Sequence, residues 1–364
     1  MSKKWFLGIC IGVLLAASSL VLSLQLLPQN TVETELVAVI PKRIQKAPAY
    51  NPQTPSLDTI FSNDHSWIAT VSAEHIRVLL ATGDVIPARS VNVQTVGEKG
   101  FIWPFAKTVD ILKNADITFA NLETPLLSSC IATTEGMAFC GSPGNVAGLT
   151  FAGIDIVSLA NNHAYNYGKE GIMETKRLLE QNSIAVTGVD GPLVQNVRGI
   201  MFAFLGYNDI TTPQPGVANT DEERIQREIA SAKKLADIVI VTYHWGVEYQ
   251  AQPDERQKYL GHFTIDAGAD LVIGNHPHWI QPIEFYKGKL ITYAHGNFVF
   301  DQMWSEETKK GVIGRYIFYD KELIDVEYLP VYIENFGQPS FLEGEEKRVI
   351  LDHMKDESIK LISQ

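Results

Sequence analysis

The stretch IRVLLATGD at residues 76–84 decides the fold class, because a mostly apolar, β-favouring run stops at a glycine and a carboxylate. Such a run is typical of a buried strand, and the glycine permits a tight turn that directs Asp84 off the strand end. Taken alone, Asp84 is equally well explained as the cap of a turn or helix. Four further strand-like runs end in polar clusters, so Asp84 is part of a pattern.

Those four clusters offer carboxylate, amide and imidazole groups, which are the side-chain types that bind divalent metals. They are Asn121-Leu122-Glu123, Asn161-Asn162-His163, His244-Trp245-Gly246 and His276-Pro277-His278. Open α/β sheets gather such groups at the carboxyl edge of their strands, so the pattern predicts one metal-centred site. Loop-forming asparagines and a buried core histidine are the alternatives for the second and third clusters. The fourth is the most specific signal, since its proline fixes the backbone between two imidazoles.

The chain alternates between strand and helix patterns from about residue 75, which implies parallel strands with helices on the outer faces. The expected strands are 76–82, 117–120, 154–160, 201–205, 238–243 and 271–273. The expected helices are 105–114, 145–152, 171–182, 221–236 and 255–267. Three later runs, 290–294, 314–319 and 323–329, read as strands without helices, so the fold is expected to be α/β with a β-rich second half.

The N-terminal segment predicts a membrane anchor. Lys3 and Lys4 precede an uncharged apolar run at residues 5–27, and roughly 23 such residues suffice to span a bilayer as a helix. The lysines favour a cytoplasmic N-terminus, so the rest is expected outside the cytoplasm on a single-pass anchor in the cell membrane. A cleavable signal peptide is the alternative, because Ala16-Ala17-Ser18-Ser19 offers small residues.

The expected organisation is therefore an anchor at 1–27, an extended proline-rich linker at 28–74, a main domain at 75–336 and a charged tail at 337–364. Cys130 and Cys140 flank a short polar loop within the main domain. Outside the cytoplasm this spacing favours a disulfide.

The charge of the chain limits its partners. A net charge of −12 argues against nucleic acid, which requires a basic face. An acidic surface also repels polyanions at long range, so an anionic group must bind through a local cation or a metal. Arg89, five residues after Asp84, is expected either to clamp such a group or to pair with an acidic neighbour.

Taken together, these segments resemble the bacterial capsule-synthesis CapA family, which is associated with poly-γ-glutamate production. The matching motifs lie within residues 76–301 and comprise Gly83-Asp84 with Arg89, Asn121-Leu122-Glu123, Asn161-Asn162-His163, His244-Trp245-Gly246 with Glu248-Tyr249, Gly268-Ala269-Asp270 before His276-Pro277-His278, and Gly296-Asn297-Phe298. The resemblance implies a calcineurin-like metallophosphoesterase fold, which is a two-sheet αββα sandwich.

The resemblance also implies a divalent metal centre of manganese, iron or zinc. Its ligands would be Asp84, Glu123, Asn162, His244, His276 and His278. Glu123 would bridge two ions, His163 would be the general acid, and Arg89 would hold a substrate carboxylate or phosphate. Ile86 replaces the histidine of the superfamily's first motif, so one complete site and one weak or absent site are expected. The complete site would use Glu123, Asn162, His244 and His276, and the weak one Asp84, Glu123 and His278.

The function implied by the resemblance is a membrane-anchored, metal-dependent hydrolase-like protein acting on an anionic polymer or phosphoester in capsule or poly-γ-glutamate synthesis, export or attachment. One alternative is a non-catalytic, metal-binding accessory subunit of a membrane polymer synthase. Another is a general extracytoplasmic phosphodiesterase. Whether the chain is an enzyme stays open between these hypotheses.

Overall fold

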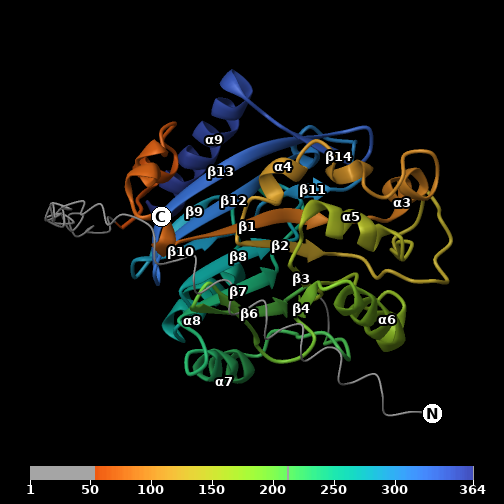
Figure 1. Ribbon diagram of the computed structural model, residues 1–364, viewed down its shortest axis with the longest axis horizontal. Coiled ribbons are helices and arrows are strands. Elements are labelled where there is room, and N and C mark those ends of the chain that lie inside the picture. Colours follow the sequence, from red (N-terminus) through yellow and green to blue (C-terminus); the bar gives the residue numbers. More distant parts are fainter. Residues whose placement is uncertain (1–53, 211–212, 364) are drawn as a thin grey trace, which may run out of the picture. The chain divides into compact units, whose positions relative to one another are not determined.

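The computed structural model describes residues 54–210 and 213–363, whose strands form two sheets (Figure 1). The first sheet contains β1 (Ile76–Val85), β2 (Ile117–Leu122), β3 (Ile156–Ser158), β4 (Ala185–Thr187), β11 (Asn297–Val299), β12 (Lys310–Tyr319), β13 (Glu322–Glu334) and β14 (Gln338–Phe341). The second contains β5 (Leu193–Val197), β6 (Ile200–Asn208), β7 (Ile238–His244), β8 (Leu271–Asn275), β9 (Ile283–Tyr286) and β10 (Lys289–Thr292). The α-helices are α2 (Leu57–Ile60), α3 (Arg89–Val96), α4 (Val109–Leu112), α5 (Asn145–Ala152), α6 (Gly168–Gln181), α7 (Glu222–Ala232), α8 (Glu255–Asp266) and α9 (Gly344–Ile362).

Successive side chains of a strand point to opposite faces of its sheet, and in these strands both faces are apolar. Each sheet therefore packs one face against the other sheet. Phe119 of β2 and Phe204 of β6 stack between the sheets with their ring centroids 6.1 Å apart. On the outer faces, α5 and α6 pack against the first sheet, while α7 and α8 pack against the second. This arrangement confirms the expected α/β two-sheet sandwich with helices outside.

Strand direction determines where the functional side chains gather. In the first sheet the order is β14-β13-β12-β1-β2-β3-β4, and β1 to β4 run parallel. In the second the order is β5-β6-β7-β8-β10-β9, and β6, β7, β8 and β10 run parallel. The late strands β12 and β13 follow one another without a helix between them, as expected, and they pair antiparallel. The helix expected at 105–114 is shorter, because only Val109–Leu112 is α-helical.

The expected boundaries of the main domain are wrong at both ends. Residues after 337 form β14 and α9, and Ile350, Leu351 and Met354 of α9 are buried in the core between the sheets. The charged residues of α9 hide this apolar stripe in the sequence, so the tail looked weakly patterned. At the other end α2 and Ile60 also join that core, so ordered structure begins before residue 75.

Leu351→Ala is expected to lower the free energy of unfolding by about 3 kcal/mol, because it leaves a cavity beneath α9. Leu351 is 5% exposed, whereas its neighbour two positions earlier, Val349, is 58% exposed. Val349→Ala is therefore the matched control and should change stability by less than about 0.5 kcal/mol. Urea unfolding of both variants measures the difference, and equal effects would mean that α9 is not part of the core.

Residues 1–27, expected as the membrane anchor, and most of the expected linker lie outside the described residues. Within 54–210 and 213–363, no helix combines the length and the apolar character needed to cross a bilayer.

Candidate metal centre

The carboxyl ends of parallel strands from both sheets meet at one place. Asp84 lies near the end of β1, while Glu123 and Asn162 follow β2 and β3 of the same sheet. From the second sheet, His244 ends β7 and His276-Pro277-His278 follows β8. All of the expected ligand side chains are buried except Asn162, which is half-buried. The structure thus brings together the six side chains that the sequence singles out.

Three of them surround one ring nitrogen of a fourth, His244. His244 Nε2 lies 3.3 Å from Glu123 Oε1, 3.0 Å from Asn162 Oδ1 and 3.1 Å from His276 Nδ1. One imidazole nitrogen can share a proton with only one of these partners, so hydrogen bonding alone does not explain the cluster. Ligand atoms with bonds of about 2.1 Å to a zinc-sized ion lie roughly 3.0–3.4 Å from one another. The three distances from His244 Nε2 therefore match the spacing between ligand atoms in a coordination shell.

Glu123 provides the clearest sign that a cation belongs here. Its side chain is fully buried, and neither carboxylate oxygen has a hydrogen-bond partner in the described part of the chain. Burial, followed by the nearby charge of Asp84, raises the pKa of Glu123 well above its usual value. A buried carboxylate without donors is costly unless a positive charge compensates it. The residues present therefore fit a divalent metal ion.

A second group of ligand atoms lies beside the first, and two of its side chains, Asp84 and His278, find hydrogen-bond partners within the protein. Asp84 Oδ1 accepts a hydrogen bond of 2.8 Å from Asn121, and Asp84 Oδ2 lies 3.3 Å from His278 Nδ1. Burial opposes ionisation of Asp84, but His278 outweighs it and lowers the pKa of the carboxyl. His278 Nδ1 also lies 2.9 Å from Asn297 Oδ1. Asp84, Glu123 and His278 can still place three ligand atoms within 4.8 Å of one another.

The position of the missing histidine is closed by apolar packing. Ile86 is fully buried and belongs to a small cluster with Ala88, Phe139 and Phe300. No imidazole can be supplied from this point. Among the described residues, the second group offers the three ligands named above, with Glu248 nearby. The weak or absent second site expected from position 86 stays a prediction.

The backbone is held in unusual conformations where it presents these ligands. His276 and His278 have φ angles of +102° and +58° on either side of Pro277. Such angles are costly for residues other than glycine and concentrate at functional sites. Gly83 is required for a different reason, since a Cβ there would lie 2.2 Å from the carbonyl oxygen of Gly296. This close approach lets β1 pair with β11 and fixes the direction of Asp84.

His163 lies next to the cluster but is oriented by other residues. Its Nδ1 is 2.9 Å from Asn166 Oδ1, and its ring stacks on Phe139 with a centroid separation of 4.0 Å. Its Nε2 lies 3.9 Å from Glu123 Oε1. Burial lowers the pKa of His163 to about 4 in the metal-free chain. The Asn166 contact leaves Nε2 free to face the cluster and the adjoining pocket.

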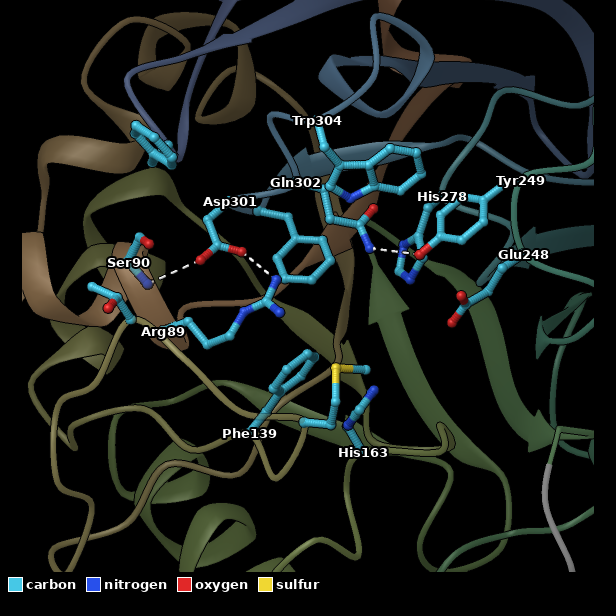
Figure 2. A pocket seen from close by; sticks show the side chains of 14 residues that line it. Arg89, Ser90, Phe139, His163, Glu248, Tyr249, His278, Asp301, Gln302 and Trp304 are labelled. Atoms are coloured by element: carbon cyan, nitrogen blue, oxygen red, sulfur yellow. Dashed lines mark hydrogen bonds and ion pairs between the residues drawn. The ribbon is translucent and has the colours of Figure 1, made fainter.

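A pocket of about 360 Å³ opens directly beside the cluster and is lined by His163, His278 and Arg89. Figure 2 shows Arg89 and Asp301 on one side of it, with Glu248 and His278 on the other. The guanidinium of Arg89 donates to Asp301, so pairing with an acidic neighbour is what the structure shows. Arg89 nevertheless remains on the pocket wall with its side chain 19% exposed.

Three contributors were missed as functional residues. Glu248 can join His276 and His278 in a third group of ligand atoms within 4.8 Å, and it also lines the pocket. Asn297 contacts His278, and Phe139 covers His163. Glu248 and Asn297 both lie in motifs on which the family resemblance rests, and this is the signal that could have identified them. Phe139 lies in a loop, where no periodic sequence pattern indicates the direction of a side chain.

The metal-free protein is expected to lose stability as pH rises from 6.5 through about 9. Burial alone would lower the pKa of His278, but Asp84 and Glu123 outweigh burial and raise it to about 9, from 6.5. A raised pKa in the folded state stabilises below the unfolded value, and this contribution disappears as pH passes the folded value.

Melting temperatures across this range, with a chelator present, measure that loss. His278→Gln should flatten the curve, whereas His262→Gln, which changes a half-buried histidine paired with Glu284, should not. Metal binding should show the opposite trend and strengthen with pH, because the ligands must release protons. An unchanged curve in His278→Gln would contradict the assignment.

Comparison with known proteins identifies the family. The model of the family "Bacterial capsule synthesis protein PGA_cap" matches residues 78–302. The chain is 29% identical to a "Capsule biosynthesis protein CapA" of Bacillus anthracis over 339 residues, which cover 85% of this chain and 82% of that protein.

Two further relatives match over a shorter region. A "PGA biosynthesis protein CapA" of Bacillus subtilis (strain 168) is 32% identical, with 64% of this chain and 65% of that protein covered. A "Probable polyglutamine synthesis accessory protein" of Mycobacterium tuberculosis is 28% identical, with 61% and 66% covered. The chain thus spans about two thirds of these two relatives. The resemblance drawn from the motifs is confirmed, and the chain belongs to the bacterial capsule synthesis protein family PGA_cap.

Proposed function

We propose that this chain is a membrane-anchored, metal-dependent hydrolase-like protein that acts in capsule or poly-γ-glutamate synthesis, export or attachment. The observation that carries the metal-dependent part is Glu123, a fully buried carboxylate without a hydrogen-bond partner, surrounded by ligand atoms from both sheets. Family membership and the names of the relatives support the capsule part.

In the proposed chemistry, the ligand residues hold the metal and His163 transfers a proton. Glu123, Asn162, His244 and His276 would hold the first divalent ion, and Asp84, Glu123 and His278 a weaker second one. When bound, such an ion supplies Lewis-acid activation of water and of a substrate oxygen. Asn166 Oδ1 accepts from Nδ1–H of His163, so Nε2 faces this region as the basic nitrogen of the neutral ring. As general acid, His163 would first take up a proton at Nε2 and then give it to the leaving group.

Arg89 would orient the anionic group of a phosphoester or polymer substrate. Asp301 and two aromatic rings, those of Phe139 and Phe300, hold its guanidinium at the pocket wall. A planar guanidinium fixed in this way is suited to carboxylate or phosphate. Such a local cation is needed because the acidic chain as a whole repels polyanions.

The proposal places the main domain outside the cytoplasm, on a single-pass anchor at residues 1–27. The disulfide between Cys130 and Cys140 supports an oxidising compartment. Protease added to cells without their outer wall is expected to digest the main domain while cytoplasmic markers survive. Full protection of the domain in these wall-free cells, with digestion only after lysis, would contradict this placement.

The central test uses the full chain in detergent, loaded in turn with manganese, iron and zinc. Elemental analysis gives ions per chain, and turnover is measured on bis(p-nitrophenyl) phosphate and on γ-glutamyl polymer. Bound metal with turnover of either substrate is the expected result. A chain that binds none of the three metals overturns the proposal.

A second candidate is a non-catalytic, metal-binding subunit of a polymer synthase. It is favoured by the apolar Ile86, which offers no ligand to the second group, and by Asp84 and His278, which pair with each other without a metal. The accessory role named for the mycobacterial relative is in line with it. Retained metal without turnover on either substrate would select this candidate.

A further inference from the structure

The loop between Cys130 and Cys140 forms one wall of the pocket. A disulfide joins its ends, and Thr134, Met137 and Phe139 line the pocket. The loop is largely exposed, with Met137 at 66%, whereas Phe139 is only 3% exposed. Phe139 is therefore the large side chain by which this loop is inserted into the body of the protein.

Phe139 contacts His163 through both its ring and its backbone. The two rings stack at 4.0 Å with an angle of 18° between their planes. The backbone N–H of Phe139 donates a hydrogen bond of 2.7 Å to Asn166 Oδ1, the same oxygen that lies 2.9 Å from His163 Nδ1. A displacement of Phe139 would therefore disturb both the plane of the imidazole and the group that orients it.

The same ring also contacts Arg89. The guanidinium carbon lies 4.9 Å from the ring centroid of Phe139 and 4.9 Å from that of Phe300. The two phenyl rings meet edge to face at 5.7 Å, with Ile86 in the same apolar cluster. Arg89 thus depends on Phe139 for half of its aromatic support. One side chain from the disulfide loop thus contacts both His163 and Arg89 on the pocket wall.

We propose that Phe139 is a positioning residue for His163 and Arg89, and that the Cys130–Cys140 disulfide holds it in place. The proposal rests on the proposed function, in which those two residues act on the substrate. A closed loop has far fewer conformations than an open one, so the disulfide restricts where Phe139 can lie. The chain would fold and bind metal without this bond, yet its pocket would become fully competent only after oxidation.

The test compares the oxidised full chain, the same protein reduced with a phosphine, and the variants Phe139→Leu and Phe151→Leu, all loaded with zinc. Phe151 is the matched control, because its ring also lies under a cation, Lys113, at 4.5 Å but lines no part of the pocket. Three quantities are measured: zinc per chain, the imidazole resonances of His163, assigned with His163→Gln, and turnover of bis(p-nitrophenyl) phosphate. Reduction needs no refolding, so it remains informative if a variant folds poorly.

Reduction and Phe139→Leu are each expected to shift the His163 resonances and to lower turnover between about 10- and 100-fold, with zinc content unchanged. Phe151→Leu should do neither, and the reductant should have no further effect on the double variant Cys130→Ser, Cys140→Ser. Unshifted His163 resonances after reduction, or in Phe139→Leu, overturn the proposal. If the oxidised parent binds zinc without turnover of this substrate, the catalytic part of the proposed function fails for zinc with this phosphodiester, while the resonances still decide whether Phe139 positions His163.

Discussion

Glu123→Gln is expected to abolish metal binding and, at the same time, to stabilise the metal-free protein. Glu123 is the one residue shared by both groups of ligand atoms that use the first sheet, the group with His244 and His276 and the group with Asp84 and His278. Loss of a shared ligand should lower metal affinity more than about 100-fold, beyond the 10- to 100-fold effect of residues that merely orient ligands.

The gain in stability has a separate physical cause. Burial raises the pKa of Glu123 well above its usual value, so its ionisation becomes unfavourable once no metal is present. A raised pKa in a folded acid means that stability falls as pH rises above the unfolded value, and glutamine removes this loss. The metal-free variant should therefore exceed the metal-free parent by about 1–3 kcal/mol above neutral pH.

Elemental analysis and urea unfolding in chelator measure the two effects. Glu248→Gln is the control, because Glu248 is half-buried on the pocket wall and belongs to neither of those groups. It should keep the first metal and leave stability nearly unchanged. Full metal content in Glu123→Gln would contradict the assignment of the centre.

His163→Ala is expected to lower turnover by a factor of about 10² to 10⁴ while leaving metal content unchanged, as loss of a general acid does. Loss of turnover without loss of metal is expected from the geometry. His163 Nε2 lies 3.9 Å from Glu123 Oε1, whereas His244 Nε2 lies 3.3 Å from that oxygen. His163 is thus adjacent to the centre but outside the closest set of atoms.

Steady-state kinetics with elemental analysis on the same samples measures this separation. His262→Gln is the matched control, since that histidine pairs with Glu284 on a different part of the second sheet and should not affect turnover. Loss of metal together with activity in His163→Ala would make His163 a ligand instead. Unchanged turnover would remove it from the proposed mechanism.

Strand ends were the informative part of the sequence. Buried parallel strands read as continuous apolar runs, so β1, β7 and β8 could be recognised, and the polar residue after each run marked the binding edge. The meeting of the two sheets at one edge is a tertiary property, and periodicity does not encode it. The resemblance to a known family supplied that step.

What the sequence hid had two physical causes. The apolar residues of α9 are separated by many charged ones, so the helix looked like a solvated tail until Leu351 and Met354 were found in the core. Phe139 acts through a disulfide-closed loop, where side-chain direction depends on long-range packing. Both α9 and Phe139 have local sequences that are normal for a helix and a loop, but their contact partners lie far away in the chain.

The central position of β1 in its sheet also determines when that sheet can form during synthesis of the chain. This strand pairs with β11 and β12, which follow it in the chain only after β2 to β10. A nascent chain therefore exposes an open edge of β1 until β11 and β12 have been synthesised. Chaperones that cover such edges are expected to set the yield of active protein.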